Sequence, residues 1–349
     1  MLGVPAGAKG PVGGGAGGRE MGTGGVRAAG GGSGGSANGG TIGSTTGGTS
    51  GSGGAVVHTI TEFTLPGIVS QPRVIVAGAD GNLWFTEYTL DKIGRITTSG
   101  VLTEFPLPPP HAGPFGIAAG RDGNLWFAEV LAHKVGFITT SGIVTEFALT
   151  PDNSLPKGVA VGPDGAPWFN GYSGDNIARL TTAGPGTVLS CGMAGVWVGI
   201  VAGPDHCLWL TGNGSDRLCK LCLDGSATLF ELPNVDSKPW GIAVGPDGNL
   251  WFAEYGGSRI GRITLAGTLT EFPIPTPDSY PIEIVAGPDG NLWFTEDAGN
   301  NIGRITPAGE ITEFPLPTAG SGPAGIAVGP DGNLWFTEQW GNRIGRINP

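Results

Sequence analysis

The sequence predicts an all-β protein: a seven-bladed β-propeller preceded by a disordered glycine-rich arm. Residues 1–54 consist mostly of Gly, Ser, Thr and Ala and have almost no large apolar side chains. Such a segment cannot bury enough surface to offset its conformational entropy, so we expect a flexible arm. Residues 55–349 instead repeat one pattern seven times, and each repeat contains a Trp after an Asp-Gly-Asn-Leu run or a variant of it.

These marker tryptophans recur every 41 or 42 residues. They are Trp84, Trp126, Trp168, Trp209, Trp251, Trp293 and Trp335. A period of about 40–45 residues is typical of four-stranded propeller blades. Seven markers therefore predict seven blades, and we expect the indole rings to pack in the core.

Each repeat divides into four short segments rich in β-branched and aromatic residues, which favour strands. In the fifth repeat they are residues 241–245, 249–254, 259–264 and 269–274. Asp247 and Gly248 separate the first two segments, and Asp-Gly is a strong signal for a tight turn. No segment has the spacing of a long amphipathic helix, so we expect antiparallel β-structure throughout.

The two ends of the repeat region predict how the ring closes. The seventh repeat stops at residues 344–347 without a fourth strand, whereas residues 59–63 precede the first marker and have the fourth-strand pattern. We therefore expect the N-terminal strand to complete blade seven. Such an interlock removes a strand edge that would otherwise promote aggregation.

Charge and hydropathy exclude several classes of partner. The net charge is −11, and no cluster of Lys and Arg offers a surface for phosphate backbones or anionic lipids. No apolar stretch reaches the length of a membrane span, and the first ten residues lack the apolar core of a secretory signal. We expect a cytoplasmic monomer with neither nucleic acid nor membrane as its partner.

The four cysteines lie in one stretch, at positions 191, 207, 219 and 222. Cys219 and Cys222 have the spacing of many zinc ligands, but residues three apart on a strand point to opposite faces. We expect buried free thiols in preference to a zinc site or a disulfide.

A binding surface is predicted where the repeats differ. The residue two before the first-strand Ile or Val should open onto the central channel. In chain order it is Arg73, Phe115, Lys157, Val198, Trp240, Ile282 and Ala324. Tyr88, Tyr255 and Trp340 follow the second strands and should add aromatic walls. We call the face where the loops entering first strands meet those leaving second strands the upper face. The mixture of side chains predicts a site for a small molecule or peptide-like ligand on this face. The alternative is an unused channel mouth whose residues vary freely.

Five blades end their second strand with a glutamate: Glu87, Glu129, Glu254, Glu296 and Glu338. Their carboxylates could form an arc that binds Mg²⁺, with Glu296 and Glu338 as the candidate ligands. The alternative, favoured by repetition in register, is a structural role in each blade.

Blade two also has two histidines, His111 and His133, on the expected upper face. With Glu129 they are candidates for a base or a metal site. Solvated loop histidines are the alternative.

The repeat is best seen over residues 287–317, which contain Gly-Pro-Asp-Gly-Asn-Leu-Trp-Phe-Thr-Glu, Ile-Gly-Arg-Ile-Thr and Ile-Thr-Glu-Phe-Pro-Leu-Pro. It resembles the repeat of the streptogramin B (virginiamycin B) lyases, and the resemblance covers about residues 57–349. It implies an enzyme that opens an ester-closed cyclic depsipeptide by elimination. In that chemistry Mg²⁺ stabilises the enolate and a His removes the proton.

The family's functional histidines follow a Pro at the start of two late blades, one of them preceded by a metal-binding Glu. Here those segments place Ile282 and Ala324 where the histidines should be, and Tyr280 and Gly322 precede the prolines. None of the other five blades supplies a His at this position. We therefore expect a propeller that binds a ligand without the family's elimination chemistry. The alternatives are an active Mg²⁺-dependent carbon–oxygen lyase with a rebuilt site and a structural or surface-display module.

Overall fold

A computed structural model describes residues 44–45, 58–109, 111–149, 155–171, 175–192 and 195–349. These residues contain strands and no helix. All of them fall in one unit, Gly39–Pro349. The predicted arm at residues 1–54 lies outside the described residues except for Ser44–Thr45, which form a short strand, β1.

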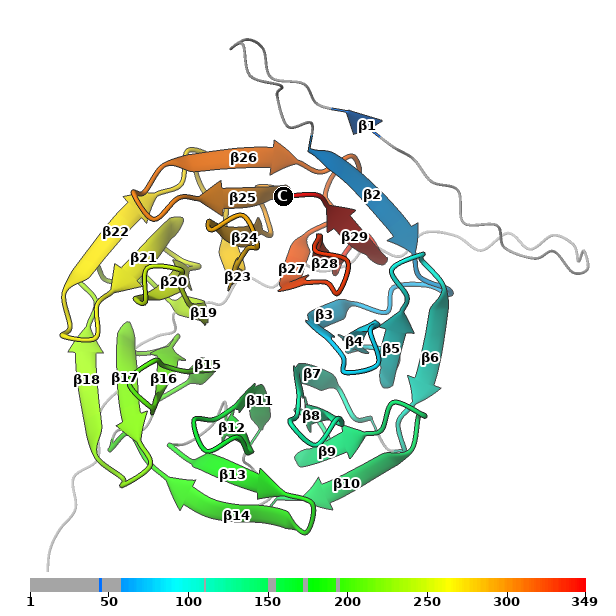
Figure 1. Ribbon diagram of the computed structural model, residues 1–349, viewed down its shortest axis with the longest axis horizontal. Helices are drawn as coiled ribbons and strands as arrows, with labels where there is room; N and C mark the ends of the chain where they lie inside the picture. Colours follow the sequence, from blue (N-terminus) through cyan, green and yellow to red (C-terminus); the bar gives the residue numbers. More distant parts are fainter. Residues whose placement is uncertain (1–43, 46–57, 110, 150–154, 172–174, 193–194) are drawn as a thin grey trace, which may run out of the picture. The chain divides into compact units, whose positions relative to one another are not determined.

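Seven antiparallel sheets surround a central channel, and the first strand of each sheet lies innermost (Figure 1). Blades one to three, from inner to outer strand, are β3 (Pro72–Ala77), β4 (Leu83–Glu87), β5 (Lys92–Ile96) and β6 (Leu102–Pro106); β7 (Pro114–Ala119), β8 (Leu125–Glu129), β9 (Lys134–Ile138) and β10 (Val144–Ala148); and β11 (Pro156–Val161), β12 (Pro167–Gly171), β13 (Ile177–Thr181) and β14 (Gly184–Leu189). The predicted seven-bladed propeller is confirmed.

The remaining blades follow the same order. They are β15 (Trp197–Ala202), β16 (Cys207–Gly212), β17 (Arg217–Cys222) and β18 (Ala227–Glu231); β19 (Pro239–Val244), β20 (Leu250–Glu254), β21 (Arg259–Ile263) and β22 (Leu269–Pro273); β23 (Pro281–Ala286), β24 (Leu292–Glu296), β25 (Asn301–Ile305) and β26 (Ile311–Pro315); and β27 (Pro323–Val328), β28 (Leu334–Glu338), β29 (Arg343–Ile347) and β2 (Thr59–Thr64). The strands expected for the fifth repeat agree with these bounds to within two residues.

Strand β2 closes the ring as the sequence predicts. It pairs antiparallel with β29, from Ile60 opposite Ile347 to Thr64 opposite Arg343. It therefore supplies the fourth strand that blade seven lacks. The other edge of β2 pairs with β1, where Ser44 lies opposite Ile60.

The marker tryptophans are core residues, and each is at most 2 % exposed. Each indole Nε1 donates a hydrogen bond to the Asp four residues earlier, as Trp251 does to Asp247 at 3.0 Å. In five blades the ring also stacks on a Phe of the outer strand; Trp251 and Phe272 have centroids 5.4 Å apart. The Asp in the turn therefore satisfies the one polar atom of a buried indole, which makes the burial favourable.

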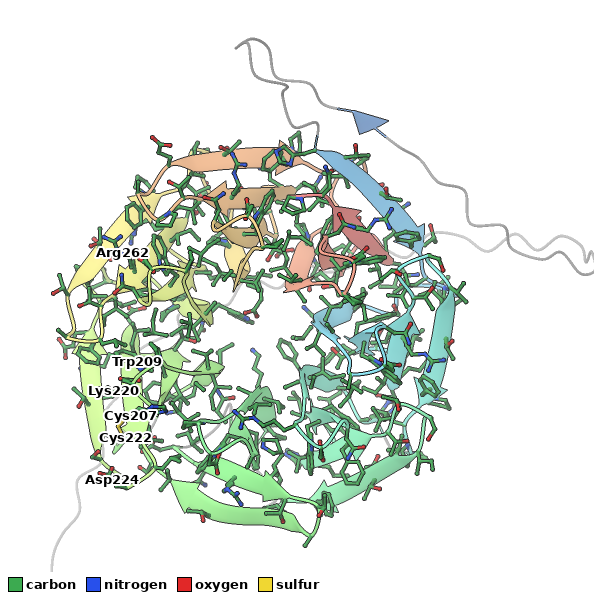
Figure 2. All side chains as sticks on the ribbon, viewed as in Figure 1. Cys207, Trp209, Lys220, Cys222, Asp224 and Arg262 are labelled. Carbon is green, nitrogen blue, oxygen red and sulfur yellow. A yellow bond between two sulfur atoms is a disulfide. The ribbon has the colours of Figure 1, made fainter. Side chains whose placement is uncertain are left out.

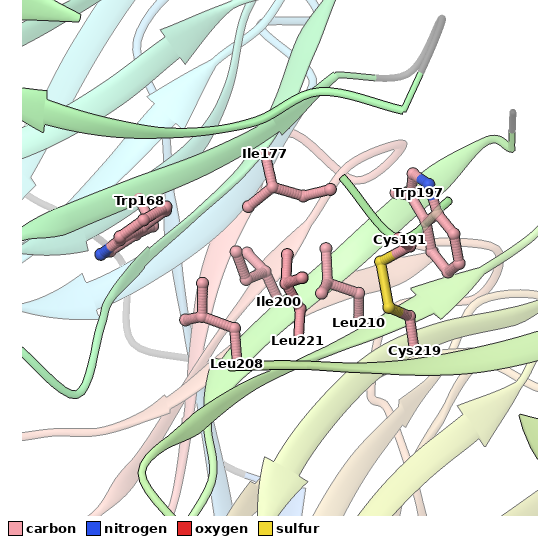
Figure 3. Packing of buried hydrophobic residues seen from close by; sticks show 9 residues of the cluster. All are labelled: Trp168, Ile177, Cys191, Trp197, Ile200, Leu208, Leu210, Cys219 and Leu221. Atoms are coloured by element: carbon pink, nitrogen blue, oxygen red, sulfur yellow. A yellow bond between two sulfur atoms is a disulfide. The ribbon is translucent and has the colours of Figure 1, made fainter. Parts of the chain in front are cut away.

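The expectation of free thiols is wrong. Cys191 bonds to Cys219, and Cys207 bonds to Cys222. Cys219 and Cys222 do point to different partners, as their spacing on β17 requires. Figure 2 labels Cys207 and Cys222, which lie opposite each other on β16 and β17. Figure 3 shows the second bond, from Cys191 to Cys219, inside the apolar cluster of blades three and four.

The described part of the chain has no helix that is long and apolar enough to cross a membrane.

Candidate functional site

The predicted binding residues meet at the mouth of the channel. Arg73, Phe115, Lys157 and Trp240 line one cavity of about 270 Å³ together with Tyr88 and Val130. A second cavity of about 270 Å³ follows the channel between the first strands, and Lys157, Trp240 and Phe115 line it too. We call the first cavity the mouth cavity.

Backbone irregularities expose these side chains to the channel. In every blade the pairing of the first and second strands shifts register at the mouth, as between Pro281 and Ile284 in blade six. The two residues inside each shift do not pair regularly with the second strand. Bulges of this kind redirect side chains near binding sites. The variable positions of the sequence are the first residues inside these shifts.

Hydrogen bonds between blades hold the mouth residues in place. Thr86 Oγ1 donates to the carbonyl oxygen of Phe115 at 2.7 Å, and Thr337 Oγ1 donates to that of Arg73 at 2.6 Å. Thr211 makes the same bond to the carbonyl of Trp240. Each hydroxyl belongs to the second strand of the preceding blade. The backbone of the site is therefore fixed by its neighbours before any ligand arrives.

Close backbone approach explains the glycines that follow most mouth residues. A Cβ on Gly158 would lie 2.5 Å from the carbonyl oxygen of Val198, which belongs to the next blade. A Cβ on Gly116 would meet the carbonyl oxygen of Lys157 in the same way. Only glycine allows the first strands to approach this closely.

Arg73 lies among three aromatic rings. Its guanidinium carbon is 5.3 Å from the centroid of Tyr88, 5.7 Å from that of Phe115 and 5.8 Å from that of Trp340. Such contacts are within the range of cation–π interactions. The guanidinium also donates a hydrogen bond to Gln339 Oε1. Burial lowers the pKa of Arg73, although the group stays cationic at neutral pH.

Asp297, in blade six, orients two residues of blade seven that contact Arg73, namely Gln339 and Trp340. Its Oδ1 accepts hydrogen bonds from Gln339 Nε2 at 2.8 Å and from Trp340 Nε1 at 3.2 Å. Burial raises the pKa of Asp297, while these hydrogen bonds and the charge of Arg73 act in the opposite direction. The carboxyl, amide and indole therefore orient one another around the guanidinium.

Lys157 is only 7 % exposed, and its amine faces two aromatic rings. The Nζ atom is 4.1 Å from the centroid of Trp240 and 4.7 Å from that of Phe115. Burial, with a smaller contribution from the charge of Arg73, lowers the pKa of Lys157 to about 7. Burial therefore weakens the preference of this amine for its charged form.

Further aromatic rings extend the site along the upper face. Tyr255 lies 5.6 Å from Trp240 and 5.0 Å from Tyr280 between ring centroids. Trp340 is 52 % exposed beside Arg73. We refer to Trp340, Tyr88, Phe115, Trp240 and Tyr255 with Tyr280 as the aromatic belt. Sequence reasoning missed the roles of Tyr280, Asp297 and Gln339, although each departs from the repeat at a loop of the upper face.

The five glutamates are buried inside their own blades. Glu296 and Glu338 are fully buried, and burial raises the pKa of each to about 8. The outer strand of the same blade brings a second carboxylate close, Glu313 beside Glu296 and Glu62 beside Glu338. In the described part of the chain no three His, Cys, Asp or Glu side chains gather to hold a metal ion. Each of these two carboxylates lies beside another carboxylate of its own blade, and the magnesium hypothesis stays a prediction.

The candidate base cluster of blade two is not assembled by any contact among the described residues. The His111 side chain is 90 % exposed, and its Nδ1 lies 3.5 Å from Asp91 Oδ2. His133 occupies a turn position with a φ of 54°, where other blades have Asn300 or Asn342. The Glu129 carboxyl is buried beside Glu146, and burial raises its pKa to about 8.

Comparison with known proteins identifies the family. The sequence model of the virginiamycin B lyase family matches residues 46–200 and 150–349. A streptogramin B lyase structure is 36 % identical, with a TM-score of 0.80, and covers 83 % of this chain and 97 % of its own. No curated protein matches the sequence.

Two structures of the virginiamycin B lyase from Staphylococcus aureus are equally similar. Each is 35 % identical, has a TM-score of 0.80, and covers 84 % of this chain and 99 % of its own. One of them is a catalytically inactive variant with quinupristin. The family match spans well over half of the sequence, and the structural matches span most of both chains. The chain therefore belongs to the virginiamycin B lyase family.

Proposed function

We propose that the protein binds a small peptide-like ligand in the mouth cavity and does not carry out the elimination reaction implied for lyases of this family. The observation that carries the proposal is the arrangement of Arg73 and Lys157 between aromatic rings at one cavity. Pockets for small molecules combine apolar walls with a few fixed polar groups in this way.

The chemistry of the mouth cavity defines the ligand. Tyr88, Phe115 and Trp240 offer ring faces for stacking, and Arg73 offers a planar fork for a carboxylate or a carbonyl. The cavity of about 270 Å³ is close to the smallest ligand pockets, so it suits one aromatic or acidic group of a larger molecule. The aromatic belt would carry the rest of such a molecule. The structure of an inactive relative with quinupristin supports this ligand class.

The residues in the family's histidine positions support binding without elimination. Ile282 lies at the small cavity next to Arg73, and Ala324 is 3 % exposed at the start of β27. Neither aliphatic side chain can accept a proton. The alternative is an active carbon–oxygen lyase with a rebuilt site, which the ring-opening assay in the Discussion tests.

A titration with quinupristin tests the proposal. Binding is followed by calorimetry and by the fluorescence of Trp240 and Trp340, with Arg73→Gln and Trp240→Ala as variants. We expect each variant to weaken binding by roughly tenfold to a hundredfold, because removing a central contact commonly costs about 1–3 kcal/mol. The control is Arg121→Ala, an exposed residue of the β7–β8 turn. No saturable binding, or equal weakening by the control, would contradict the proposal.

We also propose that the protein folds in an oxidising compartment and not in the cytoplasm expected from its sequence. The two disulfides carry this proposal, because such bonds are rare in proteins of the reducing cytosol. Thiol labelling of unfolded protein from its natural source tests it. No labelling without reductant is expected, and four labelled cysteines would contradict it.

A further inference from the structure

Glu283 differs from the residues at the same position of the other first strands. The position directly follows the mouth residue, and five blades have a glycine there. In chain order it is Val74, Gly116, Gly158, Gly199, Gly241, Glu283 and Gly325. Glu283 lines the cavity that follows the channel, which we call the channel cavity. Blade six therefore places an ionisable group at a level of the channel where the other blades have none.

A small cavity adjoins both the mouth cavity and the channel cavity. Its volume is about 20 Å³, and its lining includes Arg73, Glu283, Phe115 and Trp240. Phe115 and Trp240 also line the two larger cavities, so the three spaces are neighbours. A space of about 20 Å³ holds roughly one water-sized group.

The family's histidine positions lie at the same small cavity. Ile282 and Ala324 both line it. Neither aliphatic side chain forms hydrogen bonds. Glu283 therefore offers an acceptor at this cavity, and Arg73 offers donors.

The backbone around Glu283 fixes the position of its carboxyl. The N–H of Glu283 donates to Thr295 Oγ1 at 3.1 Å, and Thr295 Oγ1 donates to the carbonyl oxygen of Ala324 at 2.7 Å. A Cβ on Gly241 would lie only 2.6 Å from Glu283 Oε1. The carboxyl therefore lies against blade five, next to the segment that carries Trp240, and is in place before a ligand arrives.

No cation of the neighbouring strands neutralises this carboxyl. Strands β19, β20, β24 and β27 pack against β23, and none of them contains Lys, Arg or His. Their ionisable residues are Glu254 and Glu296. Lys157 also lines the channel cavity, but Glu283 forms no ion pair with it or with any other described residue. Burial raises the pKa of Glu283 to about 7, while the backbone N–H of Ile284 acts in the opposite direction. Such a carboxyl gains from a ligand that brings positive charge.

We propose that the small cavity is an ammonium subsite with Glu283 as its acceptor, and that the mouth takes free aromatic α-amino acids. The ammonium group occupies the small cavity, and the carboxylate lies against Arg73. The ring lies among Tyr88, Phe115 and Trp240. The inference rests on the proposed function, because both place a ligand in the mouth cavity, and it names the chemical class of that ligand.

The size and charge of each ligand group match its place. An ammonium group is about the size of a water molecule and has three donors for carboxylate oxygens. The planar guanidinium of Arg73 matches a carboxylate in shape and charge. The mouth cavity of about 270 Å³ accommodates a single ring. A zwitterion therefore satisfies both charged residues and adds no net charge to the site.

Calorimetric titration of the full chain with L-phenylalanine and with 3-phenylpropionate tests the proposal. The two compounds differ only in the ammonium group. We expect L-phenylalanine to bind at least about tenfold more tightly, because 3-phenylpropionate leaves the carboxyl of Glu283 without a partner.

A variant of Glu283 tests whether this preference comes from its carboxyl. Glu283→Gln should weaken the binding of L-phenylalanine by about tenfold or more and should not weaken that of 3-phenylpropionate. Retained binding of 3-phenylpropionate shows that the variant is folded. The control Glu310→Gln, on an exposed turn, removes the same charge and should bind both compounds as the wild type does.

Phenylalaninamide separates free amino acids from the N-terminal residue of a peptide, which has the same ammonium group. It lacks the carboxylate, so we expect it to bind more weakly than L-phenylalanine, and Arg73→Gln should remove that difference. Equal binding of the two compounds by the wild type would overturn the assignment to free amino acids.

Quinupristin binding measured on the same sample separates the two proposals. Quinupristin binding without a preference for L-phenylalanine over 3-phenylpropionate would overturn the ammonium subsite and leave the proposed function intact. That preference without quinupristin binding would support the subsite and count against a larger peptide-like ligand. No binding of L-phenylalanine, or a preference that persists in Glu283→Gln, would also overturn the inference.

Discussion

The buried glutamates predict that the protein loses stability as pH rises. Glu296 tests this best, because its described hydrogen-bond partner is the neutral Asn301, whose Nδ2 donates at 3.1 Å. Burial raises the pKa of Glu296 to about 8, and the nearby Glu313 acts in the same direction. In the unfolded chain this carboxyl returns to an ordinary pKa near 4.5.

The sign follows from which state holds the proton more tightly. Between pH 4.5 and about 8 the unfolded chain releases the proton of Glu296 while the folded protein keeps it, so a rise in pH favours unfolding. The stabilisation is fully present below pH 4.5 and is lost as pH rises through about 8. Each tenfold difference in proton affinity is about 1.4 kcal/mol, so Glu296 alone removes roughly 3 kcal/mol between pH 5 and pH 8. Proteins typically have only about 5–15 kcal/mol of net stability.

Urea denaturation of the wild type and of Glu296→Gln at pH 5 to 8 measures the effect. The variant should be close to the wild type at pH 5 and more stable by roughly 3 kcal/mol at pH 8, because its amide stays neutral. Glu310→Gln, on an exposed turn, is the matched control and should follow the wild-type profile. Parallel profiles for the wild type and Glu296→Gln, or a wild type that gains stability toward pH 8, would refute the reasoning.

Two further predictions concern the fold. Deleting residues 1–54 should leave the thermal midpoint nearly unchanged, because among the described residues this deletion removes only β1. Deleting residues 1–63 should destabilise the protein severely, because blade seven then loses β2. A stable monomer after the longer deletion would contradict the interlocked closure. Trp251→Ala should cost about 3–5 kcal/mol by urea denaturation, as for other buried aromatic residues. Trp240→Ala should cost much less, because its ring faces the mouth cavity, and equal losses would contradict these burial assignments.

Repetition is the reason that the sequence predicts so much of this fold. A Trp every 41 or 42 residues sets the number of blades, and the displaced strand at residues 59–63 sets the closure. The mouth residues were found because they vary inside a constant repeat, at positions where each first strand shifts its register. The same repetition favoured a structural role for the five glutamates, and all five are buried in the structure.

Features outside the repeat were harder to predict. The hairpin that places Trp209 opposite Lys220 also places Cys207 opposite Cys222, so this disulfide could have been found from register. Cys191 follows β14, whose pairing with β13 is irregular, and no spacing rule predicts that it reaches Cys219.

The repeat pattern did not predict the contacts around Arg73 either. Asp297 comes from a loop of blade six, and Gln339 and Trp340 come from a loop of blade seven. They meet Arg73 of blade one only where the ring closes.

The most direct test of the central claim is incubation of the protein with quinupristin and saturating Mg²⁺, followed by reversed-phase chromatography. Elimination adds no water, so a ring-opened product has the mass of the starting compound and is recognised by its retention time. A well-placed base contributes about 10²–10⁴-fold in rate, and neither Ile282 nor Ala324 can act as one. We expect saturable binding with no ring opening above the protein-free control. A ring-opened isomer that accumulates with enzyme concentration would contradict the account.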